Sequence, residues 1–219
     1  VAPANNATQV IRSATLQVAV TNTTPGNLAV RFYGREAPTV LPGPDFCIAV
    51  MPDTQMYTAE KGGGTRYMMI AQTEWAISNR VSRNVVYVSQ LGDISNNGDT
   101  PTYISQWYHA TNAMYRLENP VRTQLPDGMA YGVALGNHEQ SPNGWATFGT
   151  TNIGTVTNFN KYFGVSHFAG REYYAGHYST NNNNHFDFFS ASGLDFVVLY
   201  FEYNTNPPVE LLAWGNEVL

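Results

Sequence analysis

An unbroken apolar run occupies residues 46–51, FCIAVM, and the polar residues PDTQ follow it at 52–55. Two further apolar runs, at 85–88 and 131–135, likewise lead into short polar loops. Segments of helical length separate the three runs and carry apolar residues at spacings of three, four and seven. Short apolar strands that alternate with such segments predict βαβ units and a sheet with parallel strands. We therefore expect an α/β fold with a βαβαβ core.

The two segments between the runs are predicted to be amphipathic helices. The first follows a glycine-rich loop at 62–64, and its expected inner face carries Ile70, Ile77 and Val81, with Met68, Ala71 and Trp75 beside them. The second is expected to begin at Asp99-Thr100-Pro101, where Asp99 would cap the helix and Pro101 would occupy its first turn. It should run to about Asn119, and its expected inner face carries Ile104, Tyr108, Thr111 and Tyr115.

The regions on either side of this core differ from it in pattern. Residues 1–36 alternate apolar and polar positions around a turn and predict a β-hairpin, while the proline-rich residues 37–44 predict a linker. The second domain is therefore expected to span 45–219. Within it we expect a long irregular segment at 140–190, a strand at 196–203 and a helix at 209–219. Because a crossover helix normally leads to another strand of its sheet, we expect the domain to continue past Leu219.

Composition narrows the classes of protein to which this chain can belong. Of the 219 residues 43% are hydrophobic and 12% are charged, and the net charge is −5 with only two lysines, so we expect no binding to a nucleic-acid backbone. No apolar run approaches the roughly 18 residues of a membrane span, so none is expected. Lysine is largely replaced by Asn, Thr, Ser and Gly, and Asn-x-Thr sequons occur at Asn6 and Asn22. These features favour an extracellular or secreted protein.

Metal-capable oxygen ligands follow all three apolar runs. Asp53 follows the first run, Asp93 the second and Asn137 the third. Sites in open α/β sheets form beyond the carboxyl ends of the strands, so we expect these side chains to converge. Hard oxygen ligands suit divalent or trivalent cations, and Asp93 could bridge two of them. The structural alternative is that each aspartate only caps a turn.

These residues also carry a family resemblance. Asp53-x-Gln55, Gly92-Asp93 and Gly136-Asn137-His138-Glu139 resemble the first three motifs of the calcineurin-like metallophosphoesterases, in the form whose first motif has Gln in place of His. The resemblance implies an α+β sandwich of the metallophosphoesterase type, hydrolysis of phosphate mono- or diesters, and two metal ions (Fe, Mn or Zn). It implies metal ligation by Asp53, Gln55, Asp93 and Asn137. It also implies that His138 contacts the phosphate or protonates the leaving group and that Glu139 orients His138.

The resemblance covers only the N-terminal part of that catalytic domain. The family's later histidine motifs would lie beyond Leu219, and a partner chain or domain could complete the sheet. The hairpin at 1–36 resembles the last strands of an immunoglobulin-like module.

Two other interpretations stay open. The chain could be a non-catalytic extracellular structural or binding protein on a truncated or decayed phosphoesterase scaffold, since Gln55 is a weaker ligand than His and the later histidines are missing. Alternatively, the Tyr- and Asn-rich segment around 173–185 could bind carbohydrate. Within this segment His177, Asn184 and His185 are the candidates for substrate binding.

Overall fold

A computed structural model describes residues 43–141 and 154–219, all within one compact unit. The predicted hairpin at 1–36 and nearly all of the linker lie outside the described residues. The first half of the unit contains β1 (Cys47–Met51), α1 (Gln55–Thr58), α2 (Arg66–Ser78), β2 (Val85–Gln90), α3 (Ile104–Met114), α4 (Pro120–Thr123) and β3 (Tyr131–Val133). The second half contains α5 (Thr157–Phe163), α6 (Val165–Phe168), β4 (Tyr174–His177), β5 (His185–Ala191), β6 (Leu194–Tyr200) and α7 (Val209–Val218).

The first three strands form a parallel sheet in the order β1-β2-β3. This confirms the expected α/β class and the βαβαβ core. The central strand β2 has neighbours on both sides and is almost entirely buried. It extends two residues past the predicted 85–88, whereas β3 ends two residues before the predicted Leu135.

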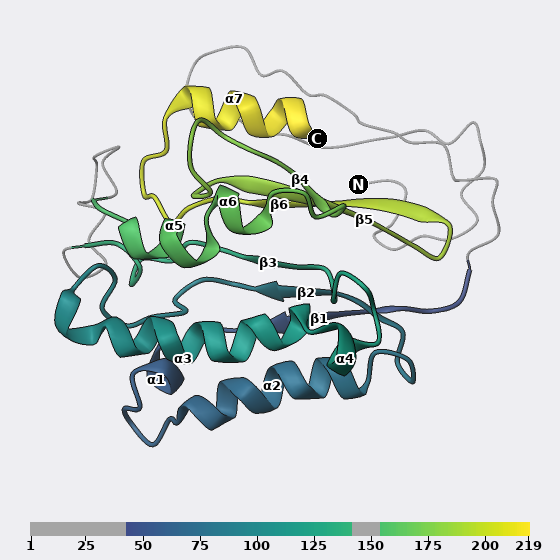
Figure 1. Cartoon of the computed structure of the whole chain (residues 1–219). Coiled ribbons are helices and arrows are strands. Elements are labelled where there is room, and N and C mark those ends of the chain that lie inside the picture. The colour runs from purple at the N-terminus through teal and green to yellow at the C-terminus, as the bar shows by residue number, and fades with distance from the viewer. Residues whose placement is uncertain (1–42, 142–153) are drawn as a thin grey trace, which may run out of the picture. The chain divides into compact units, whose positions relative to one another are not determined.

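The remaining strands form a separate antiparallel sheet, β4-β5-β6. Figure 1 shows the two sheets face to face, with α2 and α3 on the outer side of the parallel sheet and α7 on the outer side of the antiparallel one. The strand predicted at 196–203 is β6, shifted to 194–200. The sequence did not predict β5 because its buried positions include His185 and Asp187, which disguise the apolar alternation.

The inner face of α2 agrees with the prediction in part, since Ile70 and Ile77 are partly buried and pack against the core. The helix buries Met69, Thr73 and Ala76, whereas Trp75 is 47% exposed and Val81 lies beyond the helix end at 74% exposure. Thr73 can be buried because its hydroxyl donates a hydrogen bond to the Ile70 carbonyl at 2.9 Å. The most buried residues of α2 therefore lie beside the predicted Ile70 and Ile77 rather than at them.

The second helix also agrees in part, since Ile104 and Tyr115 pack against the core, but it begins differently. A 3₁₀ turn at Pro101–Tyr103 precedes α3, which buries Trp107 and Gln106 while the predicted inner residue Tyr108 is 55% exposed. Asp99 does not cap this helix. Its carboxylate instead accepts the backbone N–H groups of residues 157 and 158 at the start of α5, at 2.8 and 2.6 Å.

A buried polar network joins the two sheets. Tyr87 on β2 donates a hydrogen bond to Asp187 on β5, and the Tyr200 hydroxyl on β6 donates to Ser89 on β2 at 2.8 Å. Gly132 on β3 leaves room for the two tyrosines, because a Cβ there would lie 2.5 Å from the Tyr200 ring and 2.6 Å from the Tyr87 hydroxyl. None of the helices in the described ranges has the length and hydropathy needed to span a bilayer.

Candidate active site

The loops that follow β1, β2 and β3 meet at the carboxyl end of the parallel sheet, the end at which α1 lies in Figure 1. The Thr54 N–H donates a hydrogen bond to the Asp93 carbonyl at 3.1 Å, which joins the first two loops. The His138 N–H donates to Asp93 Oδ1 at 2.9 Å, which joins the second loop to the third. The structure thus brings together the loops that carry Asp53, Asp93 and Asn137.

Gly136 allows the Asp93 carboxylate to approach the third loop closely. A Cβ at position 136 would lie 2.3 Å from Asp93 Oδ1, closer than any side chain allows. Asp93 itself has a φ of 51°, in the left-handed region that residues other than glycine rarely adopt. This strained aspartate and the glycine beside it are typical of a site in which carboxylate position matters.

Glu139 joins the second and third loops through hydrogen bonds to their backbone. Its side chain is fully buried, and its two oxygens accept the backbone N–H groups of Asp93, Ser95 and Gly136 at 2.8–3.0 Å. Burial raises the pKa of Glu139 to about 8 despite these hydrogen bonds. The expected role of Glu139 as the partner that orients His138 is therefore wrong, because both carboxylate oxygens bind loop backbone instead.

The partner of the His138 ring is a backbone group. Nδ1 of His138 lies 3.1 Å from the Asn96 carbonyl oxygen. A carbonyl can only accept a hydrogen bond, so Nδ1 must carry the proton, and Nε2 keeps a lone pair when the ring is neutral. Sequence reasoning missed Asn96 because a main-chain carbonyl leaves no residue-type signal.

Asp53 and Gln55 bond to each other within the first loop. The Gln55 backbone N–H and its Nε2 donate to the two Asp53 carboxylate oxygens, each at 2.9 Å. The Gln55 Oε1 is consequently the free end of the amide. It is buried and has no hydrogen-bond partner within the described part of the chain.

Negative charge is concentrated at this point of the sheet. The pKa of Asp93 is raised, mainly by burial and further by the nearby Asp53 carboxylate, whereas hydrogen bonds from the third loop and the charge of His138 oppose the rise. The described residues contain no group of three or more His, Cys, Asp or Glu side chains that could hold a metal ion. The side-chain oxygen groups that the contacts place here are the carboxylates of Asp53 and Asp93 and the amide of Gln55, which bonds to Asp53.

The three candidates for substrate binding lie in the antiparallel sheet and the loop before it. Asn184 and His185 are buried, at 3% and 1% exposure, and Asn184 Oδ1 accepts the Glu202 N–H at 2.9 Å. Burial lowers the pKa of His185 to about 3, so the ring is neutral. His177 pairs with His185 across the strands and is partly buried. These positions favour a packing role over contact with a substrate.

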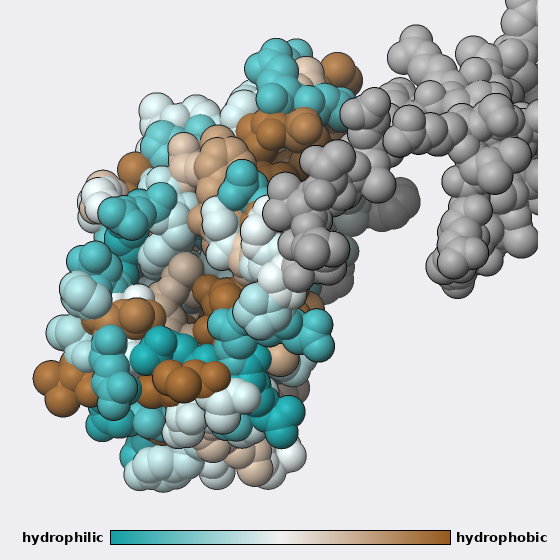
Figure 2. All heavy atoms as spheres, turned by 90° about the vertical axis from the view of Figure 1, so that its right-hand side faces the viewer, coloured by the Kyte–Doolittle hydropathy of each residue, from teal (hydrophilic) through white to brown (hydrophobic). Residues whose placement is uncertain are grey.

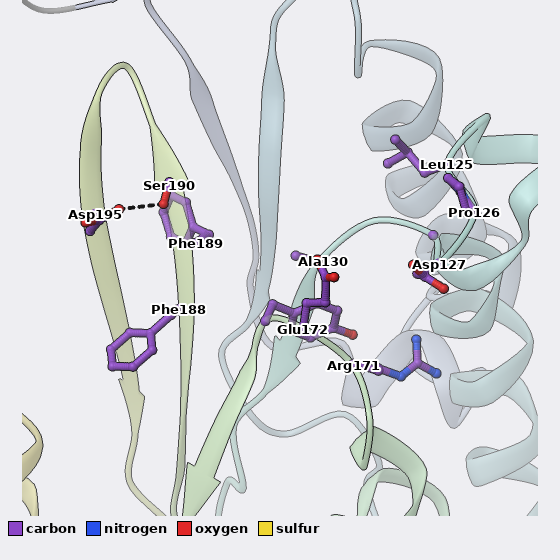
Figure 3. Close-up of a pocket in the computed structure, with 12 residues that line it drawn as sticks. Leu125, Pro126, Asp127, Ala130, Arg171, Glu172, Phe188, Phe189, Ser190 and Asp195 are labelled. Carbon is purple, nitrogen blue, oxygen red and sulfur yellow. Dashed lines mark hydrogen bonds between the residues drawn. The ribbon is translucent and has the colours of Figure 1, made fainter.

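A cavity of about 740 Å³ opens at the other end of the parallel strands. Its walls come from the segment before β3, including Leu125 and Asp127, and from the β5–β6 hairpin, including Phe188 and Phe189 (Figure 3). The space-filling view of this end shows hydrophobic and hydrophilic residues side by side around a hollow (Figure 2). The cavity is lined by none of the predicted metal or catalytic residues.

Comparison with known proteins identifies one relative and no family. No family model matches the chain. The chain is 32% identical over 169 residues to the uncharacterized protein YvnB of Bacillus subtilis (strain 168). That match covers 77% of this chain but 11% of YvnB, so the chain spans about a tenth of the length of this relative.

Proposed function

We propose that the protein is a metal-dependent phosphoesterase of the calcineurin-like type and that its two-sheet unit is the N-terminal part of that fold. The convergence of the three strand-end loops, in which Asp93 accepts the His138 N–H, carries this proposal. Turn capping alone does not account for it, because Asp93 bonds to a loop 45 residues away rather than to its own turn. In the same proposal the protein acts outside the cell, as its lysine-poor composition suggests.

The residues present fit a metal site. Asp53, Gln55, Asp93 and Asn137 would hold the metal, and the buried Gln55 Oε1 without a partner is the clearest structural indication of this role. Bound Fe, Mn or Zn ions would acidify a water molecule and neutralise phosphate oxygens. Because no group of three or more His, Cys, Asp or Glu side chains in the described residues is arranged to hold a metal ion, we propose that the remaining ligands of a dinuclear site come from outside the described residues.

The chain's own residues would orient the ester and handle a proton. His138 has its Nδ1–H bonded to the Asn96 carbonyl, so Nε2 is the ring atom that would take up a second proton and then donate it to a phosphate oxygen or to the leaving oxygen. Asp93 is held by the third loop, so its carboxylate and His138 keep a fixed separation. Glu139 fixes both loops and stays out of the reaction.

Metal binding and hydrolysis test the proposal together. Calorimetric titration with Mn²⁺ should show at least ~10-fold weaker binding to Asp93→Asn than to the wild-type chain. Asp127→Asn, an exposed carboxylate in the distant cavity, is the matched control and should bind like wild type. In the complete protein, the substitution Asp93→Asn or His138→Ala should abolish the hydrolysis of p-nitrophenyl phosphate and bis(p-nitrophenyl) phosphate. Equal Mn²⁺ affinity, or full activity in either variant, would refute the assignment.

A non-catalytic binding protein on the same scaffold is the second candidate. The observation that favours it is that no group of three or more His, Cys, Asp or Glu side chains in the described ranges is arranged to hold a metal ion. This alternative predicts Mn²⁺ binding that depends on Asp93 without turnover of either ester.

A further inference from the structure

The candidate catalytic histidine depends on the loop at 95–98, which follows Asp93. Asn96 in this loop supplies the carbonyl that lies 3.1 Å from His138 Nδ1. The orientation of the His138 ring therefore depends on where this loop places one backbone oxygen. Whatever fixes the loop also fixes the histidine.

Gln106 on α3 fixes that loop through nearly its full hydrogen-bonding capacity. Its Oε1 accepts the backbone N–H groups of Asn96 at 2.8 Å and of Asn97 at 3.1 Å. Its Nε2 donates to Asn97 Oδ1 at 2.9 Å. The side chain is 4% exposed, so these bonds form away from water, where losing a partner is costly.

The next residue on the helix secures the far end of the same loop. Trp107 donates its indole N–H to the Gly98 carbonyl at 2.8 Å, and its ring stacks on Tyr162. Two consecutive residues of α3 therefore hold both ends of the loop. Because the helix is rigid, it transmits a fixed position to the Asn96 carbonyl.

We propose that Gln106 is a positioning residue for His138. This inference rests on the proposed function and deepens it. Gln106 acts through the loop: its amide orients the Asn96 peptide, the Asn96 carbonyl holds the Nδ1–H tautomer of His138, and Nε2 is thereby the atom presented to the substrate. Gln106 does not touch the reacting atoms.

Two substitutions separate the polar role of Gln106 from its volume. Gln106→Met fills the same space but leaves the N–H groups of Asn96 and Asn97 without an acceptor, so the loop should move. Gln106→Glu keeps an acceptor for both groups and should preserve the loop. Asn182→Leu is the matched control, since Asn182 is a fully buried amide whose side chain bonds to Phe163 and Tyr174 rather than to this loop.

The tautomer of His138, read from imidazole ¹⁵N chemical shifts at a single pH where the ring is neutral, is the decisive measurement. The His138→Gln variant assigns the signals. Wild type, Gln106→Glu and Asn182→Leu should show the Nδ1–H form, whereas Gln106→Met should show a mixture with the Nε2–H form. If Gln106→Met does not fold, Gln106→Asn replaces it, because the shorter side chain cannot reach the loop. An unchanged Nδ1–H tautomer in Gln106→Met, or in Gln106→Asn where it replaces it, overturns the proposal.

Kinetics provide the second readout and separate this proposal from the first. In the complete protein, Gln106→Met should lower kcat for p-nitrophenyl phosphate by about 10- to 100-fold and change KM less than threefold. The reason is that a misplaced His138 slows proton transfer in the transition state more than it weakens substrate binding. An equal loss in Asn182→Leu would overturn the positioning role. Wild-type protein without hydrolysis would refute the proposed function alone, since the tautomer measurement does not depend on turnover.

Discussion

Asp187 should contribute to the pH dependence of the unit's stability, and Asp187→Asn should remove that contribution. This carboxyl is 1% exposed between the two sheets. One oxygen accepts a hydrogen bond from Tyr87, and Oδ1 has no hydrogen-bond partner among the described residues. Burial raises the pKa of Asp187 from an ordinary value of 3.8 to about 7, although the bond from Tyr87 opposes the rise.

The size and sign follow from linkage. A raised carboxyl pKa means that the folded protein binds the proton more tightly than the unfolded chain does. The associated stability is therefore complete below pH 3.8 and is lost as the pH rises to about 7. At 1.36 kcal/mol for each pH unit, the full loss is ~4 kcal/mol, of which about 2 to 3 kcal/mol falls between pH 5 and pH 7. The asparagine variant stays neutral but places an amide N–H₂ where Oδ1 has no partner, at a cost of ~1–3 kcal/mol at every pH.

Urea unfolding of both proteins at pH 5 and pH 8 measures this effect. Other titrating groups are common to the two proteins and cancel in the difference between them. The free energy of unfolding of Asp187→Asn minus that of wild type should be about 2 to 3 kcal/mol larger at pH 8 than at pH 5, because only wild type loses stability over this range. A relative stability that changes by less than about 0.5 kcal/mol between the two pH values would show that Asp187 does not titrate as the reasoning requires.

Two further substitutions test the packing that surrounds the site. Gly132→Ala should destabilise the unit by ~1–3 kcal/mol in urea unfolding, because its Cβ would press on Tyr87 and Tyr200; an unchanged midpoint would mean that the sheets separate easily. Asp99→Ala should cost ~1 kcal/mol through loss of the cap on α5, with faster amide exchange at Thr157, and exchange unchanged there would contradict the capping role.

Patterns of apolar residues predicted the parallel half of the fold well. The runs at 46–51, 85–88 and 131–135 became β1, β2 and β3 in parallel order. Strands buried on both faces, as β2 and β3 are, read as near-continuous apolar runs. The strand-end position of Asp53 and Asp93 followed directly from this topology.

The features that the sequence did not predict depend on hydrogen bonds and packing contacts that the pattern of residue types does not reveal. Thr73 can lie on the buried face of α2 because its hydroxyl donates a hydrogen bond to the Ile70 carbonyl. His185 occupies a buried position of β5, although its side chain is polar. Asp99 has the spacing of a cap for the nearest helix, yet it binds one that begins almost 60 residues later. Glu139 and Gln106 both bind backbone groups of other loops, and such bonds leave no periodic trace in a sequence.

The separation of Tyr87 from Asp187 along the chain also sets an order of events during synthesis. The candidate site is built from residues 53–139, whereas the partner of Tyr87 is made 100 residues after it. At about 5–20 residues per second, the ribosome needs roughly 5 to 20 s to deliver that partner. During this interval the parallel strands can pair while their second face stays open to water. We expect the nascent chain to be prone to aggregation during this interval, because the apolar face of its parallel sheet is uncovered.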